Sequence, residues 1–165
     1  MNWSRRSATN VSNELGDFID QVAQEVGSND KARTFEMIKA VLLAIRDRLD
    51  AQEVRYLGIH LPALLRYEFY DGWLPALQPQ TDADQNLIET VQQYMGKMSR
   101  YAPDLDDAIE ATCRLLVRTL GQKTLTPLAP HLPIDLLRYM GDRDAELHWQ
   151  FNRLREPLSA PNFLD

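Results

Sequence analysis

Apolar residues recur along the chain at the three- and four-residue spacing that is typical of amphipathic helices. The first apolar stripe predicts a helix over Leu15–Val26. Ser12 or Asn13 has the side chain of an N-cap for this helix. Glu14 and Asp17 would then lie in the first turn, where the helix dipole favours acids. The residues ahead of the cap, 1–12, are expected to form a flexible N-terminus.

A wider apolar stripe predicts a second, more buried helix over Lys31–Leu49, after a helix stop and a new cap at residues 27–30. The alternating charges at its end, residues 46–50, are expected to form a solvated helix face. Asp50 and Glu53 have the spacing of a capping box, which predicts the start of a short third helix.

A proline marks the start of the next helix. Pro62 suits the first position of a fourth helix, predicted over residues 63–69. The stretch 75–81 contains two further prolines and is predicted to be a linker.

The same order of signals then begins again, at an offset that drifts only from 69 to 72 positions. The His-Leu-Pro motif at 60–62 recurs at 131–133, and the Leu-Leu-Arg-Tyr motif at 64–67 recurs at 136–139. Two motifs repeated in the same order indicate an internal duplication. We therefore predict an all-α fold: a tandem duplication of a four-helix unit around a pseudo-twofold axis, plus a C-terminal helix.

The duplication defines the expected organisation of the chain. The first repeat is predicted over residues 13–74 and the second over residues 82–141, and both are expected to form one cooperative domain because each unit alone is small. An extra C-terminal helix is predicted over residues 142–156, where apolar residues again fall on one helical face, and a tail over residues 157–165.

The second repeat departs from the first in its details. Asp104 is the predicted cap of a long helix over Leu105–Leu120, and Gly121 supplies a glycine stop in place of the capping box. Pro127 and Pro130 are expected to reduce the third helix of this repeat to one short turn.

Residues 61–67, followed by Tyr-Asp-Gly-Trp at 70–73, resemble the bacterial family called domain of unknown function 2267. The Leu-Gly-Gln-Lys run at 120–123 and the His-Leu-Pro motif at 131–133 extend the resemblance, which covers roughly Phe18–Met140. It implies an all-α fold that is sometimes found beside CBS regulatory domains, and it brings no established activity or catalytic residue. No CBS pattern is visible in this sequence.

The composition of the chain argues against several classes of function. The net charge of −6, from 18 basic and 24 acidic side chains, opposes nucleic-acid binding, which needs a basic surface. No apolar run is long enough for a membrane span, so no membrane insertion is expected. The single cysteine, Cys113, cannot form an internal disulfide, and it lies on an apolar stripe that predicts an inert core thiol. A cytoplasmic location is therefore expected.

Histidine is the first residue type with candidate chemistry. His60 and His131 occupy equivalent turns, which favours a structural role such as a ring nitrogen bonded to a helix carbonyl. Three histidines and one cysteine, spread over the sequence, do not have the spacing of a zinc site, so no metal or cofactor is expected.

The repeated arginines leave two interpretations open. Arg66 and Arg138 would clamp a small anion between the repeats, or each would tie its helix to an acid on the preceding one. The second interpretation is the simpler of the two.

Only the first repeat ends in aromatic residues. Tyr70, Asp71 and Trp73 are therefore candidates for contact with a protein partner, because Tyr and Trp are enriched at interaction hot spots. The alternative is that Trp73 plugs the seam between the repeats.

These observations favour a non-enzymatic protein-interaction or regulatory adaptor module. The alternative is a small-anion or metabolite sensor that binds between the two repeats, and an enzyme ranks third because no catalytic constellation is recognisable.

Overall fold

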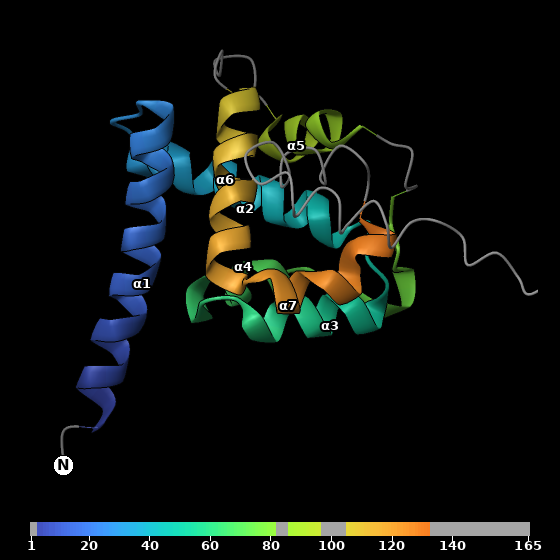
Figure 1. Cartoon of the computed structure of the whole chain (residues 1–165), viewed down its shortest axis with the longest axis horizontal. Helices are drawn as coiled ribbons and strands as arrows, with labels where there is room; N and C mark the ends of the chain where they lie inside the picture. The colour runs from blue at the N-terminus through green and yellow to red at the C-terminus, as the bar shows by residue number, and fades with distance from the viewer. Residues whose placement is uncertain (1–2, 82–85, 97–104, 133–165) are drawn as a thin grey trace, which may run out of the picture.

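The chain folds into helices joined by short turns (Figure 1). The computed structural model describes residues 3–81, 86–96 and 105–132, and those ranges contain no strand. The predicted all-α class is confirmed. The helices are α1 (Trp3–Val26), α2 (Lys31–Arg46), α3 (Ala51–His60), α4 (Ala63–Tyr70), α5 (Leu87–Met95), α6 (Leu105–Leu120) and α7 (Gln122–Leu125), with 3-10 turns η1 (Pro75–Leu77) and η3 (Thr126–His131).

Most helix ends lie where the local signals predict them. The Asp30 carboxylate accepts a hydrogen bond from the backbone N–H of Arg33, 3.0 Å away, at the start of α2. Asp50 accepts from the N–H of Glu53 at 2.9 Å, and the Glu53 carboxylate accepts from the N–H of Asp50 at 3.0 Å. The predicted capping box is therefore confirmed. α6 covers its predicted range, and Gly121 follows it with a φ of +79°.

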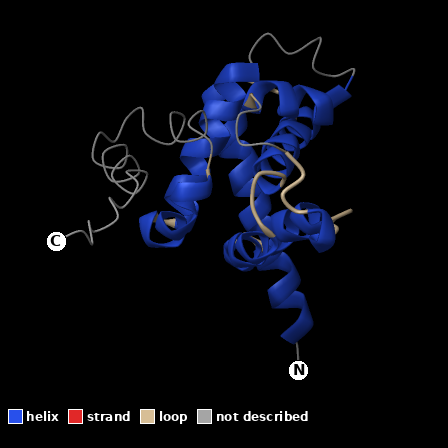
Figure 2. Ribbon diagram, turned by 90° about the vertical axis from the view of Figure 1, so that its right-hand side faces the viewer, coloured by secondary structure: helices blue, strands red, loops and turns tan. Residues whose placement is uncertain are grey.

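The predicted start of the first helix is wrong. α1 begins at Trp3 and runs through residues 12 and 13, so the helix starts at neither of these positions. Such residues favour a helix start without imposing one, and residues 3–13 contain no glycine or proline that would interrupt a helix. Glu14 and Asp17 therefore lie in the interior of α1, and the end of the helix near Trp3 projects beyond the other helices (Figure 2).

The helix that follows α6 is short, as Pro127 and Pro130 predict. α7 has only four residues, and the following 3-10 turn η3 contains Pro127 and Pro130. The predicted cap Asp104, the extra helix over residues 142–156 and the tail over residues 157–165 lie outside the described residues.

α2 is the central helix of the described structure. It packs against α1, α4, α5 and α6, while α1 also packs along α6 (Figure 1). Apolar side chains from all of these helices join one core, which supplies the hydrophobic stabilisation of the fold. Its largest fully buried members are Ile38, Leu42, Leu49, Leu61, Leu65, Phe69, Leu87, Ile109, Leu125, Leu128 and Leu132.

Three consecutive charged residues at the end of α2 are buried, which corrects the predicted solvated face. Arg46, Asp47 and Arg48 keep only 4%, 5% and 5% of their surface exposed. Arg46 Nη1 donates to the carbonyl oxygens of Phe69 and Asp71, 3.0 and 2.8 Å away, at the end of α4. The alternating charges predicted a solvent-exposed face because the local sequence does not show that the end of α4 packs over these residues.

Asp47 and Arg48 connect the same turn to the linker and to α5. The backbone carbonyl of Asp47 accepts from the N–H of Gln80 at 2.8 Å, and its carboxylate accepts from the Tyr94 hydroxyl. Burial and this hydrogen bond raise the pKa of Tyr94 to about 12. Arg48 Nη2 donates to the Thr90 hydroxyl at 3.4 Å. The end of α2 thus holds α4, the linker and α5 in place.

We predict that Arg46→Met destabilises the protein by about 3–5 kcal/mol, the typical cost of removing one partner from a buried ion pair. The substitution keeps an apolar stem but leaves the buried Asp47 carboxylate and the Phe69 carbonyl without this donor. Urea unfolding monitored by circular dichroism measures the change. Arg118→Met is the matched control, since Arg118 forms an exposed ion pair with Glu25 and its loss is expected to cost less than about 1 kcal/mol. Equal losses in the two variants would contradict the prediction.

Candidate interaction site

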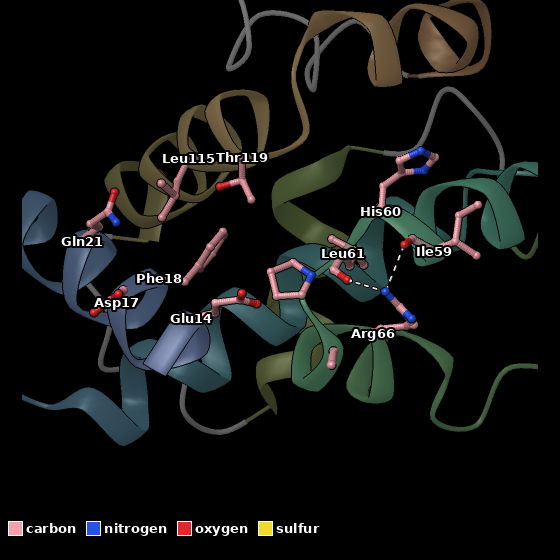
Figure 3. Close-up of a pocket in the computed structure, with 12 residues that line it drawn as sticks. Glu14, Asp17, Phe18, Gln21, Ile59, His60, Leu61, Arg66, Leu115 and Thr119 are labelled. Atoms are coloured by element: carbon pink, nitrogen blue, oxygen red, sulfur yellow. Dashed lines mark hydrogen bonds between the residues drawn. The ribbon is translucent and has the colours of Figure 1, made fainter. Parts of the chain in front are cut away.

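Arg66 closes the sharp turn between α3 and α4. Its Nε donates to the carbonyl of Gly58 at 2.9 Å, and its Nη2 donates to the carbonyls of Ile59 and Leu61, both at 3.0 Å (Figure 3). These carbonyls form the negative end of α3, where a cation is stabilised. The guanidinium therefore locks α4 against the end of α3.

These contacts differ from the simpler prediction for Arg66. That interpretation, a tie to an acid on the preceding helix, is wrong, because the acceptors are backbone carbonyls of the preceding helix and turn. The local sequence does not reveal this role, since it depends on the angle at which α4 leaves α3. The anion clamp formed with Arg138 stays a prediction, because Arg138 lies outside the described residues.

His60 has the kind of structural contact that its repeated position suggests. Its Nδ1 lies 2.8 Å from the carbonyl oxygen of Tyr56, one turn earlier in α3, and the two rings are 4.9 Å apart. Because a carbonyl only accepts, Nδ1 carries the proton in this contact. The side chain of His131 is outside the described part of the structure.

Three apolar side chains around the α3–α4 turn are exposed, and we call them together the α4 face: Ile59 of α3, and Leu64 and Tyr67 of α4. Ile59 and Tyr67 are 61% and 69% exposed, and Leu64 is 40% exposed. Tyr67 also lines a hollow of about 450 Å³, here called the α4 hollow, together with Tyr70 and Asp71. Two of the three predicted partner-contact residues, Tyr70 and Asp71, therefore lie beside Tyr67, the most exposed tyrosine of the described residues.

Trp73, the third predicted contact, is partly buried. Its ring packs against Tyr70, with centroids 5.4 Å apart, and the Arg55 guanidinium carbon lies 6.0 Å from its centroid. Its indole nitrogen is buried and has no hydrogen-bond partner among the described residues. Trp73 thus supports Tyr70 by packing against it, and its proposed contact with a partner stays a prediction.

A glycine makes the position of Tyr70 possible. The Tyr70 hydroxyl donates to the carbonyl of Arg55 at 3.1 Å, which brings the ring across α3 at Gly58. A Cβ atom at Gly58 would lie 2.1 Å from that hydroxyl oxygen. The corresponding residue two positions before the second His-Leu-Pro motif is Ala129. The glycine that the close approach of Tyr70 requires is therefore absent from the position ahead of the second motif.

A second and larger hollow also borders the α3–α4 turn, and we call it the α1 cleft. It has a volume of about 570 Å³ and lies between α1, α6 and the turn (Figure 3). Phe18, Leu61 and Leu115 close its floor. It shares two lining residues, Ala63 and Arg66, with the α4 hollow. The remaining lining residues are Glu14, Asp17, Gln21, Ile59, His60, Pro62 and Thr119.

The sequence pattern does not predict the α1 cleft. Glu14 and Asp17 are expected in a first helical turn, whereas the structure places them across from a turn some 45 positions later in the chain. Their spacing of three residues puts them on one helix face and was the available signal. Which element that face opposes is a tertiary property.

Three further features bear on function within the described ranges: metal-ligating residues, membrane-spanning helices and the single thiol. No three His, Cys, Asp or Glu side chains there converge on a point where they would hold a metal ion. Among the helices of the described ranges, none combines the length and the apolar character needed to cross a bilayer. Cys113 is fully buried, as predicted, and burial raises the pKa of its thiol to about 12.

A comparison with protein families decides where this fold belongs. The model of the family described as "Uncharacterized conserved protein (DUF2267)" matches residues 16–139. The chain belongs to the DUF2267 family. The predicted resemblance is confirmed, and the match includes every residue that lines the two hollows of this DUF2267 protein except Glu14. No curated protein matches the chain.

We predict that Gly58→Ala destabilises the protein by about 1–3 kcal/mol, because the added methyl group displaces the Tyr70 ring. The same substitution in a Tyr70→Ala background is expected to be neutral or stabilising, since alanine has the higher helix propensity. Urea unfolding of the four proteins in this double-mutant cycle gives the interaction energy. Additive effects of the two substitutions would show that the contact does not restrict residue 58.

We also predict that Cys113 is unreactive toward Ellman's reagent in the native protein. Its burial hinders access and disfavours the thiolate, so reaction requires an opening of the core. In guanidinium chloride the reagent should titrate one thiol per chain. Native protein that reacts at the denatured rate would contradict the buried position.

Proposed function

We propose that this DUF2267 protein is a non-enzymatic protein-interaction or regulatory adaptor module that binds its partner through the α4 face. The single observation that carries the proposal is the exposure of Ile59, which lines the α1 cleft, and of Tyr67, which lines the α4 hollow. Tyrosine combines a large apolar ring with a hydroxyl and is a frequent hot-spot residue. A rigid turn, held by Arg66, would present both side chains to a partner without a further loss of backbone freedom.

The predicted contacts Tyr70 and Asp71 fit the same surface, since they line the α4 hollow beside Tyr67. A cytoplasmic location is part of the proposal. The single buried free thiol supports a reducing compartment, where disulfides are rare.

We further propose that the module arose by duplication around a pseudo-twofold axis. The packing pattern supports this origin: the first helix of each half, α1 or α5, packs on the second helix of the other half, α6 or α2. The two second helices, α2 and α6, also pack on each other. Exchanging the halves interchanges the α1–α6 and α5–α2 contacts and leaves the α2–α6 contact as it is.

A small-metabolite sensor is the second candidate, and the α1 cleft favours it. Its volume falls in the range of about 300–1,000 Å³ that is typical of ligand sites, and it lies between elements of the two halves. Binding of phosphates, nucleotides or carboxylates would raise the melting temperature by mass action.

We predict that Tyr67→Ser weakens partner binding by at least about 30-fold, the equivalent of about 2 kcal/mol for a hot spot. The change in folding stability should stay within about 0.5 kcal/mol, because the side chain is 69% exposed. Quantitative co-purification from the native host identifies the partner, and calorimetry with the purified partner measures the affinity.

Leu77→Ser is the matched control for Tyr67→Ser. Leu77 is 58% exposed, but it lies in η1 and lines neither hollow. Equal affinity of wild type and Tyr67→Ser for the same partner would contradict the α4 face as the contact surface.

A further inference from the structure

The carboxylates that line the α1 cleft differ from the other described acids of α1. Asp20 forms an ion pair with Lys31 at 2.7 Å. Glu25 binds Arg114 and Arg118 on α6, at 3.1 and 2.7 Å. Although desolvation opposes it, the pairing of Glu25 with these two arginines lowers its pKa below the ordinary value. Asp20 and Glu25, which lie on α1 outside the cleft, are thus both paired with basic residues.

Glu14 and Asp17 have no such neutralisation among the side chains that the structure describes. Neither forms an ion pair with one of these side chains, and both are exposed on the wall of the cleft (Figure 3). They lie far from the start of α1 at Trp3, so the helix dipole does not stabilise them. Carboxylates three residues apart on a helix are neighbours and repel each other. A cation placed between them would remove this repulsion.

The floor and the neighbouring wall suit a cation that is carried on an aliphatic stem. Phe18, Leu61 and Leu115 close the floor with apolar groups, and Gln21 and Thr119 continue the polar rim. Lysine and arginine side chains characteristically lay their methylene stems on apolar surface and keep the charged head among polar groups.

The two basic residues of the cleft lie on its opposite wall. Arg66 directs its donors to three backbone carbonyls at the end of α3, and the negative end of the helix dipole offsets part of its charge. His60 directs Nδ1 to the carbonyl of Tyr56. The favourable position for a ligand cation is therefore on the α1 side, beside Glu14 and Asp17.

We infer that the α1 cleft receives a lysine or arginine side chain from a basic segment of the protein partner. This inference rests on the proposed function and specifies the partner's chemistry. The cleft and the α4 hollow share Ala63 and Arg66, so a segment that crosses the α4 face would reach both. The net charge of −6 favours approach of a basic partner over its whole surface.

The test is an NMR titration of the ¹⁵N-labelled full chain with the peptide acetyl-Leu-Lys-Lys-Leu-amide and with the same peptide acetylated on both lysines. Saturable shifts clustered at Asp17, Phe18, Gln21 and Thr119 are expected with the first peptide only. The double variant Glu14→Gln, Asp17→Asn should weaken binding at least about tenfold, because it removes two charge-assisted contacts. The double variant Glu36→Gln, Glu89→Gln removes the same charge from exposed sites outside the cleft and should bind like wild type.

Several results would overturn the inference. Equal shifts with the acetylated peptide would assign the binding to apolar contacts, and equal weakening in both double variants would assign it to overall charge. No saturable shift would leave the cleft without affinity for this cation. Tighter binding of 1,4-diaminobutane than of the peptide would assign the cleft to a free alkylammonium ligand in place of a partner.

The purified native partner separates this inference from the proposed function. If Tyr67→Ser loses the partner while the Glu14→Gln, Asp17→Asn variant binds it like wild type, the α4 face stands and the basic-segment inference fails. If the partner is retained by Tyr67→Ser, the proposed contact surface fails, whatever the peptide titration gives. Weakening by both changes is the expected result.

Discussion

The buried Arg46-Asp47-Arg48 turn is the constraint on which the rest of the described structure depends. Charged groups leave water only when other polar groups replace its hydrogen bonds. Here the replacements come from distant parts of the chain: the end of α4, the linker and α5. Each segment must occupy one position relative to α2 for the charges to be satisfied. The apolar core favours collapse in many arrangements, whereas this set of directed bonds selects one of them.

The buried turn at the end of α2 also fixes the position of α4, which carries the candidate site. Arg46 binds carbonyls at the end of α4, and Arg66 binds carbonyls at the end of α3, so the short helix α4 is held at both of its ends. α4 buries only Leu65 and Phe69 and leaves Tyr67 and Leu64 outside. A surface that is both apolar and rigid loses little entropy on association, which is the property that a contact surface needs.

The two halves of the chain differ in sequence where the first one carries its aromatic residues. Gly58 accommodates Tyr70, and Tyr70 in turn packs against Trp73. The second half has Ala129 in place of this glycine, and no aromatic residue follows its Leu-Leu-Arg-Tyr motif within six positions. The glycine and the aromatic residues of the first half thus form one packing arrangement, next to the surface that we propose for binding. Membership of the DUF2267 family covers both halves and does not by itself distinguish them.

The sequence by itself determined the helical class, the capping box at Asp50, the stop at Gly121 and the burial of Cys113, since each depends on local spacing or on one apolar stripe. Tertiary structure decided the roles of residues whose partners are distant in sequence. Arg46 and Asp47 have the pattern of a solvated face, yet they are buried because α4 and the linker return over them. Glu14 and Asp17 became the wall of a cleft only when α1 was placed opposite the α3–α4 turn. Hydrogen-bond geometry within a helix is set by neighbours a few residues away, whereas burial and opposing walls are set by the packing of the whole chain.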